Sequence, residues 1–369
     1  MKKIRIAISG GGTGGHIYPA LAILDSLSQM AEIKVLYLGS ANSQEEKRAV
    51  NLAIPFQRVK ARGLSRRSPK IVWQMLVNYQ GFWQAKRILK NFSPNLVVGT
   101  GGYVAAPVLR AAISLGLPTL IHEQNAYPGL ANKMLAPKVS RVCLTFQAAA
   151  PHFRRQDNLV VTGLPVRRVI MEAKREEAWE RLGFSPGHPL LLITGGSQGA
   201  QRLNRVATAA YRGLLDQGWQ ILHLTGEAGY EEALAAAKSQ DLAKESRLSI
   251  RPYLEEMEYA LALADLVLSR AGASFISELL CRGLPAILVP YPYAAGDHQR
   301  YNARALEEKG AALVIEDEEL TASTFLVIAG GLLVDEERRQ AMSAASCGMG
   351  NPLAGERIAE LILELVRIG

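Results

Sequence analysis

The feature that most constrains the fold is a regular alternation of short apolar runs with segments of helical length. The runs form two series of six, at 4–9, 34–38, 96–98, 119–122, 141–144 and 159–162, and at 189–194, 219–224, 249–252, 266–268, 286–289 and 312–315. Strands that alternate with helices form βαβ units, whose parallel sheets are covered on both faces. The pattern predicts an α/β protein of two doubly wound, Rossmann-like domains, each with a ligand crevice at the carboxyl ends of its strands.

The charge distribution divides the chain where the first series ends. Residues 1–163 carry 21 Lys and Arg against 6 Asp and Glu, a net charge of +15, whereas residues 164–369 carry 21 against 28, a net charge of −7. We therefore place the domain seam near Gly163-Leu164-Pro165. A basic half joined to an acidic half predicts that the first domain meets an anionic partner. Segment 355–368 has the apolar spacing of an amphipathic helix.

Cysteines and apolar stretches bear on the compartment. The three cysteines, Cys143, Cys281 and Cys347, lack metal-ligand spacing, and we expect free thiols in a reducing compartment. The N-terminal apolar run is interrupted by Arg5 and ends in glycines, which favours a buried strand over a signal peptide. The uncharged stretches 91–109 and 111–122 contain Gly, Pro, Asn and Ser, so neither is predicted to span a membrane. We expect a cytosolic protein, or one that lies on a membrane without crossing it.

Each series opens with a strand, a glycine-rich turn and a helix. In the first, residues 10–16 precede a helix predicted over 18–29, with Pro19 in its first turn. Glycine-turn amides and a helix N-terminus can bind a phosphate or diphosphate. A dinucleotide motif can be threaded through 10–15, but Leu38-Gly39-Ser40 stands where the acidic ribose ligand is expected, which disfavours a nicotinamide cofactor. His16, at the mouth of this loop, can take a proton from an attacking hydroxyl, although an isolated histidine is often a satisfied structural residue.

The second series has further polar segments at strand ends. Residues 195–200 form a second glycine loop that contains Ser197, and residues 269–278 open a helix after a strand. Glu278 can accept both hydroxyls of a ribose, or it can be a solvated glutamate of a capped helix. Asp297 and Gln299 can bind sugar hydroxyls, or form an N-cap and a turn. Two domains with loops suited to phosphates favour a nucleotide-sugar transferase over a hydrolase.

Seven motifs in order closely resemble the MurG family of GT-B glycosyltransferases, over nearly the whole chain. They are Gly-Gly-Thr-Gly-Gly-His at 11–16, Gly-Thr-Gly-Gly-Tyr at 99–103, His-Glu-Gln-Asn at 122–125, Gly-Leu-Pro-Val-Arg at 163–167, Gly-Gly-Ser-Gln-Gly-Ala at 195–200, Ser-Arg-Ala-Gly-Ala at 269–273 followed by Glu278, and Asp-His-Gln at 297–299.

The resemblance implies a GT-B fold with its active site in the cleft between the domains. Its last helix would cross back, so that the domains are 1–163 plus about 350–369, facing the acceptor and the membrane, and 164–349, which holds the donor. The implied reaction moves N-acetylglucosamine from UDP-N-acetylglucosamine to the 4-hydroxyl of undecaprenyl-diphosphoryl-N-acetylmuramoyl-pentapeptide (lipid I to lipid II), the last intracellular step of peptidoglycan precursor synthesis. It implies an inverting β-1,4 transfer with no cofactor and no metal.

The resemblance also assigns roles to individual residues. His16 is the expected catalytic base, with Glu123 in reserve. Residues expected at the substrates are Thr13, Gly14 and Gly15 at the acceptor diphosphate, Asn125 and Gln299 at sugar hydroxyls, Arg167 and Ser197 in the donor site, Leu254 at the uracil through its backbone, Ala273, Ser274, Phe275, Ile276 and Ser277 near the donor diphosphate, and Glu278 at the ribose.

A basic, aromatic stretch gives the first domain a second predicted role. Residues 47–122 contain twelve Lys and Arg and no Asp or Glu, and an Arg-Arg-Ser-Pro-Lys run at 66–70 precedes the apolar residues Ile71, Val72, Trp73, Met75, Leu76, Tyr79, Phe82 and Trp83. Aromatic residues flanked by cations suit a helix at an anionic membrane surface, so we expect a peripheral protein on the cytoplasmic face. The alternative is a core face with a solvated rim.

Three other classes of protein remain as alternatives. Another GT-B enzyme, such as a glycolipid synthase or a UDP-sugar epimerase, would share the donor site. A dinucleotide-dependent oxidoreductase would bind NAD. A nucleic-acid binder is suggested by the basic pI alone, but the chain has no recognition motif and its second domain is acidic, so we expect no nucleic acid.

Overall fold

A computed structural model describes residues 3–63, 71–196 and 199–368. These form two compact units, one of residues 1–165 and 352–369 and the other of residues 166–351. Unit 1 and unit 2 below denote these two sets of residues. The acceptor and donor roles expected for them stay predictions.

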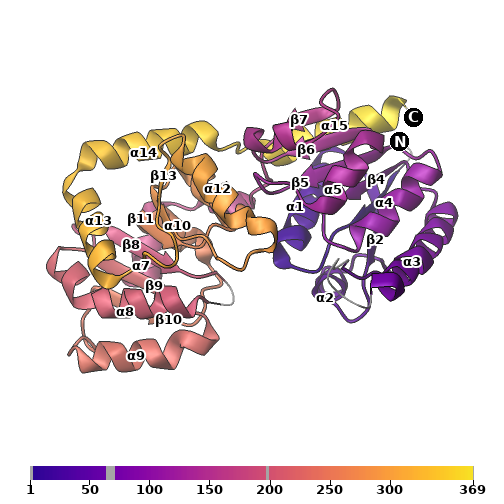
Figure 1. Cartoon of the computed structure of the whole chain (residues 1–369). Coiled ribbons are helices and arrows are strands. Elements are labelled where there is room, and N and C mark those ends of the chain that lie inside the picture. The colour runs from indigo at the N-terminus through magenta and orange to yellow at the C-terminus, as the bar shows by residue number, and fades with distance from the viewer. Residues whose placement is uncertain (1–2, 64–70, 197–198, 369) are drawn as a thin grey trace. The chain divides into compact units, whose positions relative to one another are not determined.

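Unit 1 is built on a seven-stranded parallel sheet with the strand order β3-β2-β1-β4-β5-β6-β7. Figure 1 labels β2 and β4 to β7 of this sheet. Its strands are β1 (Ile4–Ser9), β2 (Ile33–Gly39), β3 (Phe56–Arg58), β4 (Leu96–Gly99), β5 (Thr119–Glu123), β6 (Arg141–Leu144) and β7 (Leu159–Val161). Its helices are α1 (Gly14–Met30), α2 (Gln44–Asn51), α3 (Ile71–Phe92), α4 (Ala105–Ser114), α5 (Leu130–Leu135) and α15 (Ala354–Ile368), with 3₁₀ turns η1 (Ala136–Lys138) and η2 (Gln147–His152).

Unit 2 repeats this architecture with a six-stranded parallel sheet, ordered β10-β9-β8-β11-β12-β13. Its strands are β8 (Leu190–Thr194), β9 (Gln220–Leu224), β10 (Leu248–Arg251), β11 (Ala264–Ser269), β12 (Ala286–Leu288) and β13 (Ala312–Val314). Its helices are α6 (Arg168–Glu172), α7 (Arg175–Leu182), α8 (Gln201–Asp216), α9 (Tyr230–Ser239), α10 (Met257–Leu263), α11 (Ala273–Arg282), α12 (His298–Glu307), α13 (Ala322–Val334) and α14 (Glu336–Met349), with 3₁₀ turns η3 (Glu227–Gly229) and η4 (Ala295–Asp297).

Strands β1 and β4, in the middle of the unit 1 sheet, bury side chains on both of their faces. Ala7 and Val97 pack in one core cluster, whereas their strand neighbours Ile6, Ile8 and Val98 pack in another. Side chains alternate between the two faces of a strand, so helices must cover both sides of this sheet. The prediction of two doubly wound α/β domains is confirmed.

The last helix belongs to unit 1, where α15 packs against α1. Ile358 and Ile362 are fully buried in the cluster that also holds Ile23 and Leu27. The two backbones approach closely, because a Cβ built on Gly355 would lie 2.1 Å from the Ser26 hydroxyl oxygen. Glycine at this position therefore permits the contact between the helices.

Two local expectations were wrong. Helix α1 begins at Gly14, four residues before the predicted start, so Pro19 lies inside the helix and has no N–H to donate to the Gly15 carbonyl. Strand β3 was missed because it is a three-residue edge strand whose Gln57 and Arg58 are exposed, and so lacks an apolar run.

Candidate functional site

The first glycine loop lies between β1 and α1 at the carboxyl end of β1. Thr13, which stands just before α1, and Gly15 are exposed, and Gly14 is half-buried. The Thr13 carbonyl accepts hydrogen bonds from the amides of His16 at 3.1 Å and Ile17 at 3.3 Å, which closes the first turn. The three residues expected at the acceptor diphosphate thus lie together at an accessible helix N-terminus, which favours anions.

An internal carboxylate borders the same loop. Glu45 of α2 is buried, and its oxygens accept hydrogen bonds from the Ser40 amide at 3.2 Å and the Gly12 amide at 3.4 Å. A side chain on Gly11 would collide with this carboxylate, since a Cβ there would lie 2.5 Å from it. The Gly12 amide is therefore engaged within the protein, and the anion-binding capacity of the loop falls to Thr13, Gly14 and Gly15.

His16 is held from the opposite side by the loop after β4. Its Nδ1 lies 3.0 Å from the Thr100 carbonyl oxygen and 3.1 Å from Gln124 Oε1. The Thr100 hydroxyl donates to the His16 carbonyl at 2.7 Å. Gly101 has a φ of +95°, and a Cβ on it would lie 2.9 Å from His16 Nδ1, so this position requires glycine. A carbonyl oxygen can only accept, so Nδ1 carries the proton and Nε2 is the basic ring nitrogen.

Glu123, expected as the reserve base, is engaged on both carboxylate oxygens. Oε1 accepts from the Asn125 amide at 3.0 Å and its side-chain nitrogen at 3.3 Å, and Oε2 accepts from the Gly129 amide at 3.0 Å and Asn132 Nδ2 at 2.8 Å. The side chain is also buried. Four donors stabilise the carboxylate and use its lone pairs, so Glu123 holds the loop that presents Asn125, and the geometry favours His16 as the base.

The residues expected near the donor diphosphate open helix α11. The residue before the helix is Gly272, which has no side chain to cap the first amides. The Ser274 hydroxyl oxygen is buried with no hydrogen-bond partner, whereas the Ser277 hydroxyl donates to the Ala273 carbonyl at 3.0 Å. An uncapped helix N-terminus beside an unsatisfied hydroxyl is suited to a phosphate oxygen. Ile276 is fully buried and its amide donates to the Gly272 carbonyl at 2.9 Å, so Ile276 supports the start of the helix, and Phe275 is half-buried.

Glu278 lies one turn further along α11, with 18% of its side chain exposed. Its Oε1 is 3.9 Å from Arg167 Nη2. Burial raises the pKa of Glu278 to about 7, with a smaller lowering by Arg167 and a smaller raising by Glu258. Leu254 is buried in the loop between β10 and α10. Arg167 and Glu278 are thus brought together as a charged pair whose carboxylate can accept ribose hydroxyls.

Gln299, at the start of α12, joins two loops of unit 2. Its Oε1 accepts from the Ala271 amide at 3.1 Å and the Tyr291 amide at 3.0 Å. These contacts direct the amide nitrogen away from the two backbone donors, which leaves it available as a donor to a sugar hydroxyl. Ser197, the remaining predicted donor residue, lies outside the described residues.

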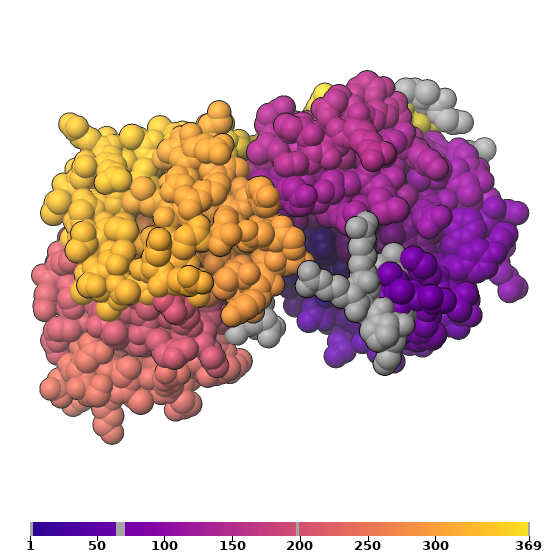
Figure 2. All heavy atoms as spheres, in the orientation of Figure 1, coloured from indigo at the N-terminus to yellow at the C-terminus, as the bar shows by residue number. Residues whose placement is uncertain are grey.

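Helix α3 carries the predicted membrane face. Only Gly81, Ala85 and Leu89 of this helix are buried, and their spacing of four puts them on one stripe. Figure 2 shows α3 (dark purple) at the surface of unit 1. Six apolar side chains on it are at least half exposed, namely Val72, Trp73, Met75, Leu76, Tyr79 and Trp83. They are therefore not core residues, and we call them the α3 apolar face.

Cations flank the α3 apolar face. Arg62 lies over the Trp73 ring at 5.7 Å, and Lys86 lies over the Trp83 ring at 5.4 Å. The basic run at 66–70 lies outside the described residues. None of the described helices is long and apolar enough to cross a bilayer.

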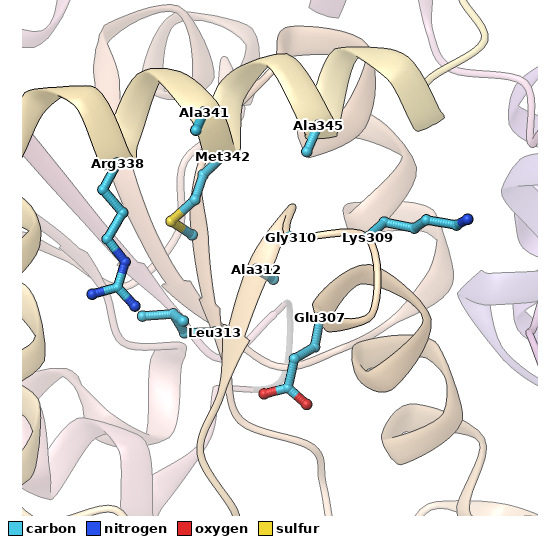
Figure 3. Close-up of a pocket in the computed structure, with 9 residues that line it drawn as sticks. All are labelled: Glu307, Lys309, Gly310, Ala312, Leu313, Arg338, Ala341, Met342 and Ala345. Atoms are coloured by element: carbon cyan, nitrogen blue, oxygen red, sulfur yellow. The ribbon is translucent and has the colours of Figure 1, made fainter.

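A separate hollow of about 380 Å³ lies on unit 2 between β13 and α14 (Figure 3). Its lining includes Glu307, Lys309, Arg338 and Met342, and none of the predicted substrate residues. Glu307 already accepts from the Val314 amide at 3.2 Å and pairs with Arg304. This hollow is therefore distinct from the predicted site residues.

The sequence missed three residues that shape the first loop, namely Glu45, Thr100 as a partner of His16, and Gln124. Thr100 and Gln124 both stand inside motifs quoted above. The place of Gln124 between Glu123 and Asn125, two predicted site residues, could have indicated that it also lies at the site. Nothing in the pattern around Glu45 distinguishes it from the adjacent Glu46, whose carboxylate pairs with Arg58 at the surface.

Comparison with known proteins agrees with this architecture. Models of the glycosyltransferase family 28 N-terminal and C-terminal domains match residues 6–144 and 190–358. Two Rossmann-like units with these matches define a two-domain glycosyltransferase. The UDP-N-acetylglucosamine--N-acetylmuramyl-(pentapeptide) pyrophosphoryl-undecaprenol N-acetylglucosamine transferase of Halothermothrix orenii is 42% identical over 365 residues, covering 97% of this chain and 98% of the relative. The chain belongs to this family of N-acetylglucosamine transferases, and the resemblance seen in the motifs is confirmed.

Solved structures extend the comparison. The crystal structure of Acinetobacter baumannii MurG is 27% identical, with a TM-score of 0.77 over 98% of this chain and 100% of that one. A UDP-N-acetylglucosamine 2-epimerase has a TM-score of 0.68 at 14% identity, over 100% of this chain and 98% of that one. The second likeness shows a shared fold alone.

Proposed function

We propose that this chain transfers N-acetylglucosamine from UDP-N-acetylglucosamine to the 4-hydroxyl of the muramoyl sugar in undecaprenyl-diphosphoryl-N-acetylmuramoyl-pentapeptide. The observation that carries the proposal is the 42% identity, over almost the full length, to an enzyme named for this transfer. The reaction inverts the anomeric carbon in one displacement, so that an α-linked donor gives a β-1,4 linkage.

A base must take the hydroxyl proton as the new bond forms, and we assign this step to His16. Thr100 and Gln124 face Nδ1 at 3.0 and 3.1 Å, so the proton sits there and Nε2 is the atom that accepts. The nearby Thr13, Gly14 and Gly15 would hold the acceptor diphosphate. Because Glu123 is held by four donors, it supports Asn125 at the sugar and does not act as the base.

The departing UDP needs stabilisation of its diphosphate and a grip on its nucleoside. The amides at the start of α11 and the Ser274 hydroxyl can meet the diphosphate, since an uncapped helix N-terminus stabilises developing negative charge. Ser197 would contribute to the same donor site. Glu278 would accept the ribose hydroxyls beside Arg167, with the Leu254 backbone at the uracil. Gln299 would donate to the sugar. These groups can act without a cofactor.

One experiment tests the proposal against its closest alternatives. The full chain is incubated with UDP-N-acetylglucosamine and a lipid I analogue, and UDP release and disaccharide formation are measured. We expect both only when donor and acceptor are present together. An epimerase would change the UDP-sugar without an acceptor, a glycolipid synthase would use another acceptor, and an oxidoreductase would respond to NAD. Any of these results, without the disaccharide, would contradict the proposal.

The α3 apolar face supports a peripheral location on the cytoplasmic face of the cell membrane. Exposed aromatic residues flanked by Arg62 and Lys86 combine apolar insertion with attraction to anionic lipid headgroups. The acceptor is itself anchored in a membrane by its undecaprenyl chain, so an enzyme that lies on the surface meets it there. The net charge of +15 on residues 1–163 acts in the same direction.

Vesicle binding tests this location. Replacing Trp73 and Trp83 with alanine is expected to weaken binding to vesicles containing phosphatidylglycerol by about tenfold or more, because each ring contributes a large apolar area. A matched control replaces Val327 and Val334 of α13, which are 74% and 83% exposed, with serine. Equal binding by all three proteins would eliminate α3 as the membrane face.

A further inference from the structure

Gln124 lies at the centre of a buried hydrogen-bond network that ends at His16. The side chain is 2% exposed and follows β5. Its Nε2 lies 2.8 Å from the Thr100 carbonyl oxygen, 3.0 Å from the His122 carbonyl oxygen and 3.1 Å from His122 Nδ1. Its Oε1 faces His16 Nδ1 at 3.1 Å. Gln124 therefore contacts both His16, of the motif at 11–16, and His122, of its own motif at 122–125.

The chemistry of the neighbours determines which way the Gln124 amide points. Two of the atoms around Nε2 are carbonyl oxygens, which only accept hydrogen bonds. Turning the amide over would bring Oε1 against both carbonyl oxygens, so that hydrogen-bond acceptors would face one another. The carbonyls of Thr100 and His122 thus hold Nε2 on their side and direct Oε1 toward His16.

His122 fits the same orientation. Its Nε2 lies 3.0 Å from the Gly163 carbonyl oxygen, so this nitrogen carries the proton and donates. Burial lowers the pKa of His122 to about 4, so the ring is neutral near pH 7 and its Nδ1 is an acceptor. That acceptor faces the Gln124 Nε2. Along the path from Gly163 through His122 and Gln124 to His16, each donor faces an acceptor, and the two N–H groups of Gln124 Nε2 are shared among three acceptors.

We infer that Gln124 is a positioning residue that holds His16 as the tautomer with the proton on Nδ1 and directs the basic Nε2 toward the acceptor. The importance of this tautomer for transfer rests on the proposed function, whereas the tautomer itself does not. Thr100 offers His16 one acceptor, and Gln124 adds the second, which restricts rotation of the ring as well as the site of its proton.

The test reads the histidine tautomer directly. Long-range ¹H–¹⁵N correlation spectra of protein labelled with ¹⁵N-histidine distinguish a protonated from an unprotonated ring nitrogen, and the His16→Ala spectrum assigns the His16 signals. We expect protonated Nδ1 and unprotonated Nε2 in the unsubstituted chain. In Gln124→Met, we expect the ratio of this tautomer to the other to fall by about fivefold, the effect of one hydrogen bond. We also expect kcat to fall while the KM for UDP-N-acetylglucosamine is unchanged.

Controls separate positioning from general destabilisation. Gln220, which is also 2% exposed, lies at the start of β9, and within the described part of the chain its side chain bonds to the backbone at 185 and 188. Gln220→Met should therefore leave the His16 signals and kcat unchanged. Gln124→Asn keeps an amide that is one methylene too short to reach His16, and it should behave as Gln124→Met does.

Three results would overturn the inference. They are an unsubstituted chain with the proton on His16 Nε2, substituted chains with the same His16 signals as the unsubstituted one, and a loss of kcat in Gln124→Met that Gln220→Met reproduces. Failure of the proposed function looks different. In that case the spectra follow the expectation, but the chain makes no disaccharide or His16→Ala makes it at a near-normal rate.

Discussion

The pH dependence of donor binding is the prediction that the structure specifies most closely. Glu278 is held in a mostly buried position on α11, 3.9 Å from Arg167, and burial raises its pKa to about 7. A carboxylate accepts two ribose hydroxyls better than the neutral acid does, because the acid must use one oxygen as a donor. Donor affinity should therefore fall as the pH falls through about 7.

The size of this effect follows from the ionised fraction. About one pH unit below the pKa, roughly one-tenth of Glu278 is ionised, so the affinity for UDP-N-acetylglucosamine should be about tenfold lower than at about pH 8. The same raised pKa lowers stability as the pH rises, because the unfolded carboxyl ionises near its ordinary pKa while the folded one stays protonated up to about 7. Donor binding and stability should thus respond to pH in opposite directions.

Isothermal titration calorimetry with UDP-N-acetylglucosamine, from about pH 6 to about pH 8, measures this profile. The sugar nucleotide is a better probe than UDP, because its diphosphate has no terminal phosphate that titrates in this range. Glu278→Gln should bind weakly with a flat profile. Glu258→Gln removes a negative neighbour and should move the midpoint to lower pH. Glu231→Gln, on the exposed start of α9, is the matched control. A profile of the unsubstituted chain that matches Glu278→Gln would refute the reasoning.

Three further predictions concern unit 1. His16→Ala should lower kcat by about 100-fold or more with little change in donor affinity, and near-normal turnover of the folded variant would eliminate His16 as the base. Glu123→Gln should lower the free energy of unfolding by about 1–3 kcal/mol in urea titrations, because an amide nitrogen would face one of its backbone or side-chain donors. A loss of kcat equal to that of His16→Ala without loss of stability would instead support Glu123 as a base. Ile362→Ala, at a fully buried position, should cost about 2–5 kcal/mol in the same titrations, and a cost below about 1 kcal/mol would contradict the packing of α15 on α1.

Central strands were predictable from sequence because a parallel strand that is buried on both faces is a continuous apolar run. Strand β3 lies at the edge of the sheet, where it pairs with β2 alone. Two of its three residues are polar and exposed, so its sequence contains no apolar run that would predict a strand. The start of α1 was misplaced for a related reason. Gly14 and Gly15 are poor helix formers, so their intrinsic propensity did not predict the helix turn that they begin.

The candidate site residues also divide into those that the sequence could predict and those that depend on contacts made in the folded structure. Thr13, Asn125 and the residues from Ala273 to Ser277 follow strands, and the topology of a parallel sheet places such residues at the carboxyl edge of their own domain. The bond from His16 to Gln124 joins residues 108 positions apart, and it depends on the direction of two backbone carbonyls. From the sequence, Glu123 was a candidate base because a carboxylate can accept a proton. In the structure, four donors within nine residues bind this carboxylate, so it stabilises the loop.

The sequence by itself determined two doubly wound domains, the positions of their glycine loops and the family to which the chain belongs, because these depend on the local order of apolar runs, turns and motifs. Only the tertiary structure showed that the Glu45 carboxylate accepts a hydrogen bond from an amide of the first loop and that burial raises the pKa of Glu278. Only the tertiary structure, too, indicated which nitrogen of His16 carries the proton. Burial and donor–acceptor geometry are properties of the neighbours that folding brings together, and residues far apart in the chain supply those neighbours.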